Sequence, residues 1–140
     1  MESTLTSPIT IETIINEPLA KVWDYWTQPK HICNWCFADE SWHAPKAEND
    51  LKVGGKFLTR MEAKDQSFGF DFEAYYTEIN VGKNFTYEFG GRICTVNFDD
   101  LIDSTKVTVS FDPENENPVE MQKAGWQLIL NNFKSYTESN

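Results

Sequence analysis

Residues 117–136 read NPVEMQKAGWQLILNNFKSY and predict a long C-terminal helix. Asn117 supplies an N-cap, Pro118 suits the first turn, and Glu120 places a negative charge near the helix N-terminus. The polar side chains fall on one narrow arc, made of Lys123, Gln127, Asn131, Lys134 and Glu138. The apolar residues expected in the core are Trp126, Leu128, Ile129, Leu130, Phe133 and Tyr136. Because so wide an apolar face needs a broad partner, we predict a curved sheet around this helix.

Upstream of this helix, from residue 54 onward, the hydrophobic pattern has a period of two, which is typical of half-buried antiparallel strands. The clearest run is FGFDFEAYYTEI, residues 68–79, in which Asp71 and Glu73 face away from the apolar side chains of Phe68, Phe70, Phe72 and Tyr76. The same alternation assigns a further set to the inner face: Phe57, Thr59, Met61, Phe85, Tyr87, Phe89, Cys94, Val96, Phe98, Val107, Val109 and Phe111. Short polar or glycine-containing breaks separate the runs and predict hairpins.

The N-terminal third of the chain predicts one strand and two short helices. Residues 9–15 are β-branched and partly alternating, and Pro18 suits the first turn of a helix whose apolar face carries Val22 and Trp26. A second short helix is expected from Pro29 to about Trp35. The fold class is therefore α+β: one strand, two short helices, several antiparallel strands and a long helix. We predict one domain over residues 1–140, with a loose start at 1–8 and a polar tail at 137–140.

The composition limits the classes of partner. A formal net charge of −10 opposes binding to nucleic-acid phosphates or anionic lipids, since both require an excess of Lys and Arg. The sequence shows neither a signal peptide nor an apolar run long enough to span a membrane, so we expect a cytoplasmic protein. Three cysteines, an odd number, favour free thiols over a disulfide framework.

Four segments together carry a family resemblance: WCFADESWHAP, DLKVGGKF, RMEAKDQSFGFDF and AGWQLILNNFKSY. In their order and spacing they resemble the START-like (SRPBCC) superfamily, and within it the branch of heat-shock protein 90 ATPase activator homologues. The resemblance covers nearly the whole chain and implies a helix-grip fold, in which a curved antiparallel sheet wraps around the C-terminal helix. It also implies a cavity between sheet and helix that holds a hydrophobic ligand.

The segment HICNWCFADESWH, residues 31–43, contains two of the three cysteines and both histidines. Cys33, Cys36, His31 and His43 are of the types that bind zinc, and the Cys-x-x-Cys spacing also occurs in redox proteins. Residues His31 and Cys33 diverge on a helix, however, and no βαβ unit surrounds the motif. We therefore interpret the segment as an aromatic wall and predict neither a metal nor a cofactor.

The cavity candidates are the inward-facing aromatic and apolar residues together with the few polar groups among them. Gln122 and Asn132 interrupt the apolar arc of the last helix and require hydrogen-bonding partners, either from a ligand or from the protein itself. The full set is Trp35, Trp42, His43, Phe57, Thr59, Met61, Phe70, Phe72, Tyr76, Tyr87, Gln122, Trp126, Leu130, Asn132 and Phe133. A packed core uses the same residue types, so the sequence leaves a hollow and a filled centre as alternatives.

Three functions follow from these observations. The first is binding of a hydrophobic or amphipathic small molecule by a monomer or homodimer. The second, implied by the resemblance, is an interaction with the heat-shock protein 90 chaperone. The third is an enzyme of the polyketide cyclase kind, which we rank last because no catalytic constellation is evident. Arg60, Glu62 and Asp71 are interpreted as ion pairs on the outer face rather than as an acid/base site.

Overall fold

The computed structural model describes residues 8–140; most of the expected loose start, residues 1–7, lies outside the described residues. Seven strands form one antiparallel sheet in the order β1-β7-β6-β5-β4-β3-β2. The strands are β1 (Ile9–Ile15), β2 (Trp42–Asn49), β3 (Lys56–Ala63), β4 (Gly69–Asn80), β5 (Asn84–Phe89), β6 (Arg92–Asp100) and β7 (Thr105–Phe111). The helices are α1 (Leu19–Thr27), α2 (Pro29–Ile32) and α3 (Val119–Ser139).

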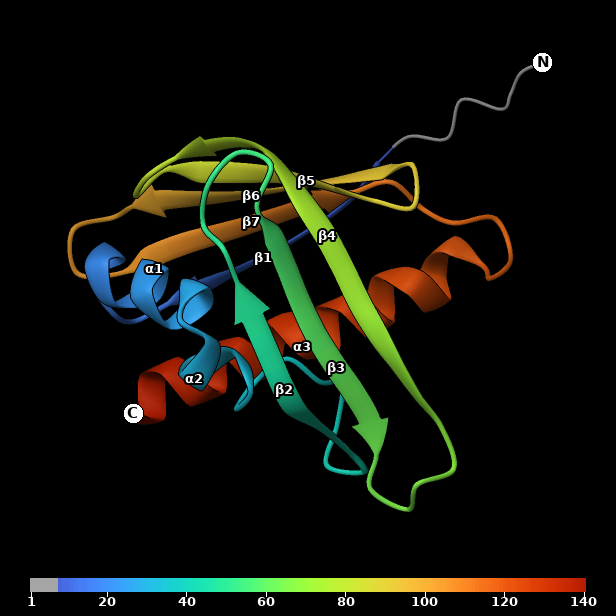
Figure 1. Ribbon diagram of the computed structural model, residues 1–140. Helices are drawn as coiled ribbons and strands as arrows, with labels where there is room; N and C mark the ends of the chain where they lie inside the picture. Colours follow the sequence, from blue (N-terminus) through green and yellow to red (C-terminus); the bar gives the residue numbers. More distant parts are fainter. Residues whose placement is uncertain (1–7) are drawn as a thin grey trace.

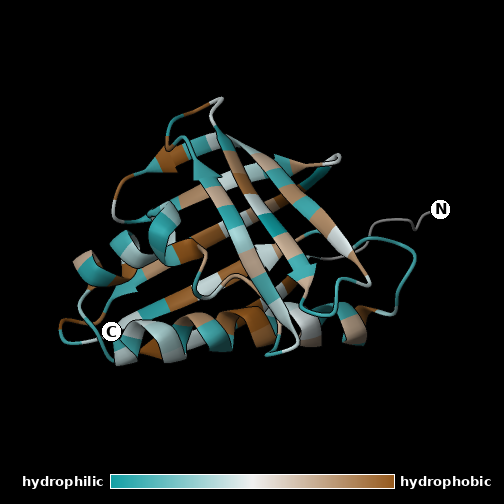
Figure 2. Ribbon diagram, turned by 60° about the horizontal axis from the view of Figure 1, so that its bottom comes forward, coloured by the Kyte–Doolittle hydropathy of each residue, from teal (hydrophilic) through white to brown (hydrophobic). Residues whose placement is uncertain are grey.

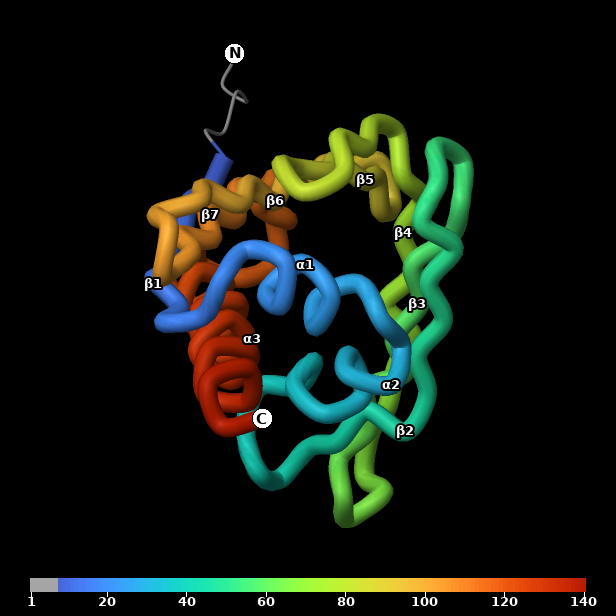
Figure 3. The backbone as a smooth tube through the Cα atoms, turned by 90° about the vertical axis from the view of Figure 1, so that its left-hand side faces the viewer, coloured from blue at the N-terminus to red at the C-terminus, as the bar shows by residue number. Residues whose placement is uncertain are grey.

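The sheet curls around the helices, so the predicted helix-grip arrangement is confirmed. Figure 1 shows α3 lying across the concave side of the sheet, and Figure 3 shows the arc from β1 to β2 with the three helices inside it. The alternation of apolar and polar side chains appears as coloured bands along the strands (Figure 2). In β7, every second residue from Thr105 to Phe111 is buried, as the period of two predicts.

One strand, β2, was not predicted. It lies at the edge of the sheet, contains Pro45, and its pairing with β3 shifts register between His43 and Lys46. An edge strand makes ladder hydrogen bonds on one side only, so it tolerates proline and needs no continuous apolar face. These features conceal the period of two on which the prediction of strands depends.

Two residues assigned to the inner face at the start of β4 are less covered than the pattern suggests. The side chain of Phe68, which precedes the strand, is 61% exposed, and that of Phe70 is 40% exposed. Both lie at the end of the β3–β4 hairpin that projects away from the helices in Figure 1, where they pack against Trp42 of the edge strand β2. Farther along the strand Ala74 and Tyr76 are buried as the pattern requires.

The helices begin and end at slightly different residues from those expected. Pro118, not Asn117, occupies the N-cap position of α3, and Asn117 instead donates from Nδ2 to Glu114 Oε1 at 3.0 Å. The polar tail predicted at 137–140 is the last turn of α3, in which Thr137 is fully buried. The second short helix, α2, is shorter than expected and ends at Ile32.

The buried face of α3 is narrower than the sequence suggests. Leu130 and Phe133 are buried, whereas Leu128 is 47% exposed. Phe133 lies in the centre of the core, where its ring contacts the indoles of Trp26 and Trp35 at centroid distances of 4.7 and 4.8 Å. Trp26 comes from α1, so a single aromatic cluster joins the short helices to α3.

Candidate functional site

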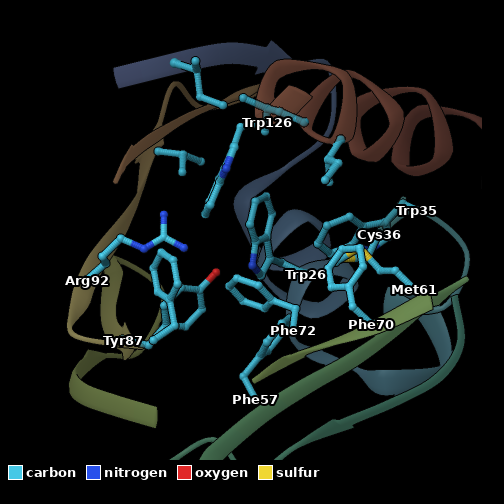
Figure 4. A pocket seen from close by; sticks show the side chains of 15 residues that line it. Trp26, Trp35, Cys36, Phe57, Met61, Phe70, Phe72, Tyr87, Arg92 and Trp126 are labelled. Carbon is cyan, nitrogen blue, oxygen red and sulfur yellow. The ribbon is translucent and has the colours of Figure 1, made fainter. Parts of the chain in front are cut away.

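A cavity of about 270 Å³ lies between the concave face of the sheet and α3 (Figure 4). Its walls are almost entirely aromatic and aliphatic side chains from both helices and strands. The lining residues are Ile11, Trp26, Trp35, Cys36, Phe57, Met61, Phe70, Phe72, Tyr87, Phe89, Arg92, Val109, Trp126, Ile129 and Leu130. Trp126 stacks on Phe111 with 3.8 Å between ring centroids, and its indole closes one end of the cavity.

Eight of the predicted site residues lie together in this lining: Trp35, Phe57, Met61, Phe70, Phe72, Tyr87, Trp126 and Leu130. They come from the loop after α2, from β3, β4 and β5, and from α3. Strand periodicity and the apolar arc of the last helix therefore predict residues that the fold places together in one continuous apolar surface.

Three predicted polar residues lie outside the lining because they bond to the protein itself. The Tyr76 hydroxyl donates to Asn49 Oδ1 at 2.6 Å. Asn132 Nδ2 donates to the backbone oxygens of Trp35 at 3.0 Å and Phe37 at 3.3 Å. Gln122 Nε2 donates to the backbone oxygens of Glu114 and Asn117 and thereby ties the preceding loop to the first turn of α3. All three groups therefore have partners within the protein, and none of the three residues lines the cavity.

The other four predicted residues also lie outside the lining. Trp42 packs against Phe68 and Phe70 at the edge of the sheet. The ring of His43 is partly exposed and its Nε2 lies 3.6 Å from Glu62 Oε1. The remaining two, Thr59 and Phe133, are fully buried within the core.

Arg92 is the lining residue that sequence reasoning missed most clearly. Gly90 and Gly91 have φ values of 58° and 81°, which suit a two-residue hairpin turn between β5 and β6. This turn sets Arg92 directly opposite Phe89, and residues directly opposite in an antiparallel pair share a face. The sequence pattern does predict this position, because Arg92 lies two residues before Cys94 and four before Val96, and alternate residues of a strand share a face.

Six more lining residues were missed: Ile11, Trp26, Cys36, Phe89, Val109 and Ile129. Phe89 and Val109 were assigned to the inner face, and Trp26 to an apolar helix face, but a core position and a cavity wall look the same in a sequence. Which inward side chains border the space is decided by the curvature of the sheet and the position of α3 over it.

Two indole N–H groups of buried lining residues differ in whether they have a hydrogen-bonding partner. Trp35 Nε1 donates to the backbone oxygen of Tyr25 at 3.0 Å. Trp26 Nε1 has no hydrogen-bonding partner among residues 8–140 and almost no accessible surface, and in Figure 4 it is directed toward the side where Tyr87 and Arg92 lie. An unsatisfied buried donor costs about 1–3 kcal/mol, so the Trp26 N–H is a group that a hydrogen-bond acceptor would stabilise.

The four cysteine and histidine side chains of residues 31–43 do not converge. His31 Nδ1 lies 2.7 Å from the Tyr136 hydroxyl, and the His31 ring stacks on Tyr25. His43 instead faces Glu62. Cys36 borders the cavity, where burial raises the pKa of its thiol to about 12. Among residues 8–140 no group of three or more His, Cys, Asp or Glu side chains is arranged to hold a metal ion.

We expect the three thiols to differ in reactivity with Ellman's reagent at pH 8. Burial raises the pKa of both Cys36 and Cys94 to about 12, so about 10⁻⁴ of each is the reactive thiolate at this pH. Cys33 is only half-buried and should react first. One fast thiol is expected in the folded protein and three after unfolding, and Cys33→Ser should abolish the fast phase. Equal rates for all three thiols in the folded protein would contradict this assignment.

The family now follows from comparison with known proteins. A family model described as "Activator of Hsp90 ATPase homolog 1-like protein" (AHSA1) matches residues 16–138, which is most of the chain. The chain belongs to the AHSA1-like family. The resemblance expected from the four sequence segments is thereby confirmed. No curated protein matches the chain.

Solved structures agree with this membership. The AHSA1-like protein from Aeromonas hydrophila is 38% identical, with a TM-score of 0.89 over 94% of this chain and 92% of that one. A protein from Cytophaga hutchinsonii is 48% identical, with a TM-score of 0.81 over 95% of this chain and 93% of that one. A protein from Chromobacterium violaceum, at 21% identity and a TM-score of 0.83 over 96% of this chain and all of that one, shares the fold. In the described part of this AHSA1-like chain, no helix is long and apolar enough to cross a membrane.

Proposed function

We propose that this AHSA1-like protein binds an apolar or amphipathic small molecule between the sheet and α3. The observation that carries the proposal is the cavity of about 270 Å³, which is partly open to solvent and bordered by residues of the hydrophobic core. Well-packed interiors contain few voids larger than a water molecule, since empty space forfeits dispersion contacts. Space of this size, lined by aromatic rings, suits a small organic molecule.

The volume limits the size of the ligand. An engineered cavity of about 150 Å³ in another protein takes up benzene, which has six carbon atoms. On the same scale a cavity of 270 Å³ accommodates about ten to twelve non-hydrogen atoms. We therefore propose a ligand with one ring and a short chain, or an alkyl chain of similar size.

We propose a binding role rather than a catalytic one. The lining contains neither a carboxylate nor a histidine that could serve as a general base. The Tyr87 hydroxyl is neutral at physiological pH, as tyrosine ordinarily is, and burial raises its pKa further, so it does not supply a phenolate base. We also propose a cytoplasmic location, which the three free thiols support because reducing compartments keep cysteines unpaired.

The direct test is an NMR titration of the ¹⁵N-labelled protein with 3-phenylpropan-1-ol, a neutral molecule of suitable size. We expect saturable shifts at the lining residues. Trp126→Ala removes one wall of the cavity and should weaken binding about tenfold or more. The matched control is Leu128→Ala on the exposed side of the same helix, which should leave Kd unchanged within about twofold. Shifts that do not saturate, or that spread over the outer surface, would contradict the proposal.

The family description suggests a second function, stimulation of the heat-shock protein 90 ATPase. The net charge of −10 favours a basic surface on such a partner. Adding the purified protein to the chaperone of its own host should then raise the ATPase rate, and the stimulation should weaken at high salt because surface charges are screened. An unchanged ATPase rate at a saturating concentration of the protein would remove this function.

A further inference from the structure

We infer that the ligand is a monocarboxylate whose carboxylate group is bound at the Arg92 end of the cavity. The inference rests on the proposed function and identifies the chemical class of the bound molecule. Its basis is the set of polar groups that border an otherwise apolar space: Trp26, Tyr87 and Arg92.

These three groups all offer hydrogen-bond donors. Arg92 and the Trp26 indole have donors only, and the Tyr87 hydroxyl is held in its protonated form by burial. Figure 4 shows the Tyr87 hydroxyl and the Arg92 guanidinium on one side of the cavity, with the Trp26 nitrogen directed toward it. The Tyr87 hydroxyl has the Cys94 sulfur, a weak acceptor, opposite it, and the lining contains no side-chain carboxylate or amide oxygen that would accept from the three groups. A ligand group that accepts several hydrogen bonds is complementary to this arrangement.

The absence of an ion-pair partner at Arg92 favours an anionic ligand group over a neutral hydrogen-bond acceptor. Arg92 lies over the ring of Phe89, with 4.6 Å from Cζ to the ring centroid, and its Nη1 makes a long contact of 3.5 Å with the backbone oxygen of Asp112. Within residues 8–140 no carboxylate forms an ion pair with it. The other arginine, Arg60, is paired with Glu62 at 2.9 Å and Asp71 at 3.5 Å.

The Glu114 carboxylate interacts with Arg92 only at longer range, without an ion pair. A guanidinium that has no ion-pair partner and lies beside an apolar cavity matches one negative charge. A carboxylate accepts two parallel hydrogen bonds from an arginine and has further lone pairs for the Tyr87 and Trp26 donors. A doubly charged phosphate would leave one charge uncompensated in a low-dielectric space, which is unfavourable. The apolar remainder of the molecule then fills the space between Phe57, Phe72 and Trp126.

The test compares 3-phenylpropionate with 3-phenylpropan-1-ol, two probes that differ in the charged group, by calorimetric titration at pH 7. We expect the acid to bind about 10- to 100-fold more tightly, the range for a charge-assisted hydrogen bond. Arg92→Gln should abolish this preference, because it should weaken binding of the acid at least tenfold more than binding of the alcohol. Arg60→Gln is the matched control, because it removes the same side-chain group outside the cavity, and it should preserve the preference.

The outcomes separate the two proposals. Equal affinity for acid and alcohol, or a preference for the acid that survives Arg92→Gln, overturns the carboxylate assignment and leaves the binding function intact. Failure of both probes to bind overturns the binding function and the assignment with it. If Arg92→Gln does not fold, Tyr87→Phe removes a second donor. This variant should weaken binding of the acid at least threefold more than binding of the alcohol. An equal effect of Tyr87→Phe on both probes contradicts the assignment.

Discussion

Replacing Phe133 by alanine is expected to lower the free energy of unfolding by about 3–5 kcal/mol, the range for deleting a fully buried phenylalanine. The Phe133 ring lies edge-on to both Trp26 and Trp35, so its removal leaves a gap between α1, the loop after α2, and α3. The large indoles on either side have little freedom to collapse into that gap. Urea unfolding followed by tryptophan fluorescence measures the loss.

The matched control for this variant is Leu128→Ala. Leu128 lies on the same helix but is nearly half exposed, so its replacement should change the free energy of unfolding by about 0.5 kcal/mol or less. Alanine also favours the helix slightly, which excludes a helix-propensity effect as the cause of a large loss. Similar losses for both variants would contradict the central position of Phe133.

Gly55→Ala is expected to destabilise the protein by about 3 kcal/mol, at the upper end of the cost of overpacking a core. A Cβ atom on Gly55 would lie 2.0 Å from the backbone oxygen of Asp50 and 2.9 Å from that of Lys52. The Gly55 backbone also pairs with Tyr76, through which the turn before β3 is attached to β4. Because the obstruction is backbone, relief of the collision requires a shift of the whole turn.

The neighbouring Gly54→Ala separates this collision from ordinary glycine strain. Gly54 has φ of 85° and open space around its Cβ position, so the variant tests only the cost of a left-handed conformation. That cost is about 1–2 kcal/mol. Thermal unfolding of both variants should show the larger loss for Gly55→Ala, and the reverse order would contradict the packing of this turn against residues 50–52.

Strand prediction succeeded where buried and exposed side chains alternate strictly and failed where they do not. In β7 the buried residues Val107, Val109 and Phe111 alternate strictly, since each borders the core and each intervening residue borders water. In β2 the requirement is weaker at the sheet edge, and Pro45 within the strand contradicts the local preference for strand. Prediction from periodicity therefore depends on a difference in environment between the two faces.

The polar residues show a second limit of sequence reasoning. Asn132 and Gln122 interrupt an apolar helix face, and the requirement for hydrogen-bonding partners was correctly inferred. Their partners are backbone oxygens of Trp35, Phe37, Glu114 and Asn117, not a ligand. Two of these partners lie nearly a hundred residues away from Asn132, so no local pattern could identify them.

By itself, the sequence determined the class of fold, because the periods of two and 3.6 are set by backbone geometry and appear in neighbouring residues. It also determined most of the apolar walls, since inward-facing positions follow from those periods. Only the tertiary structure decided that space remains between the walls, since a void depends on the curvature of the whole sheet and on the position of α3. It likewise decided which polar groups face that space: Asn132 and Gln122 are satisfied elsewhere, and the Trp26 N–H and the Arg92 guanidinium border it.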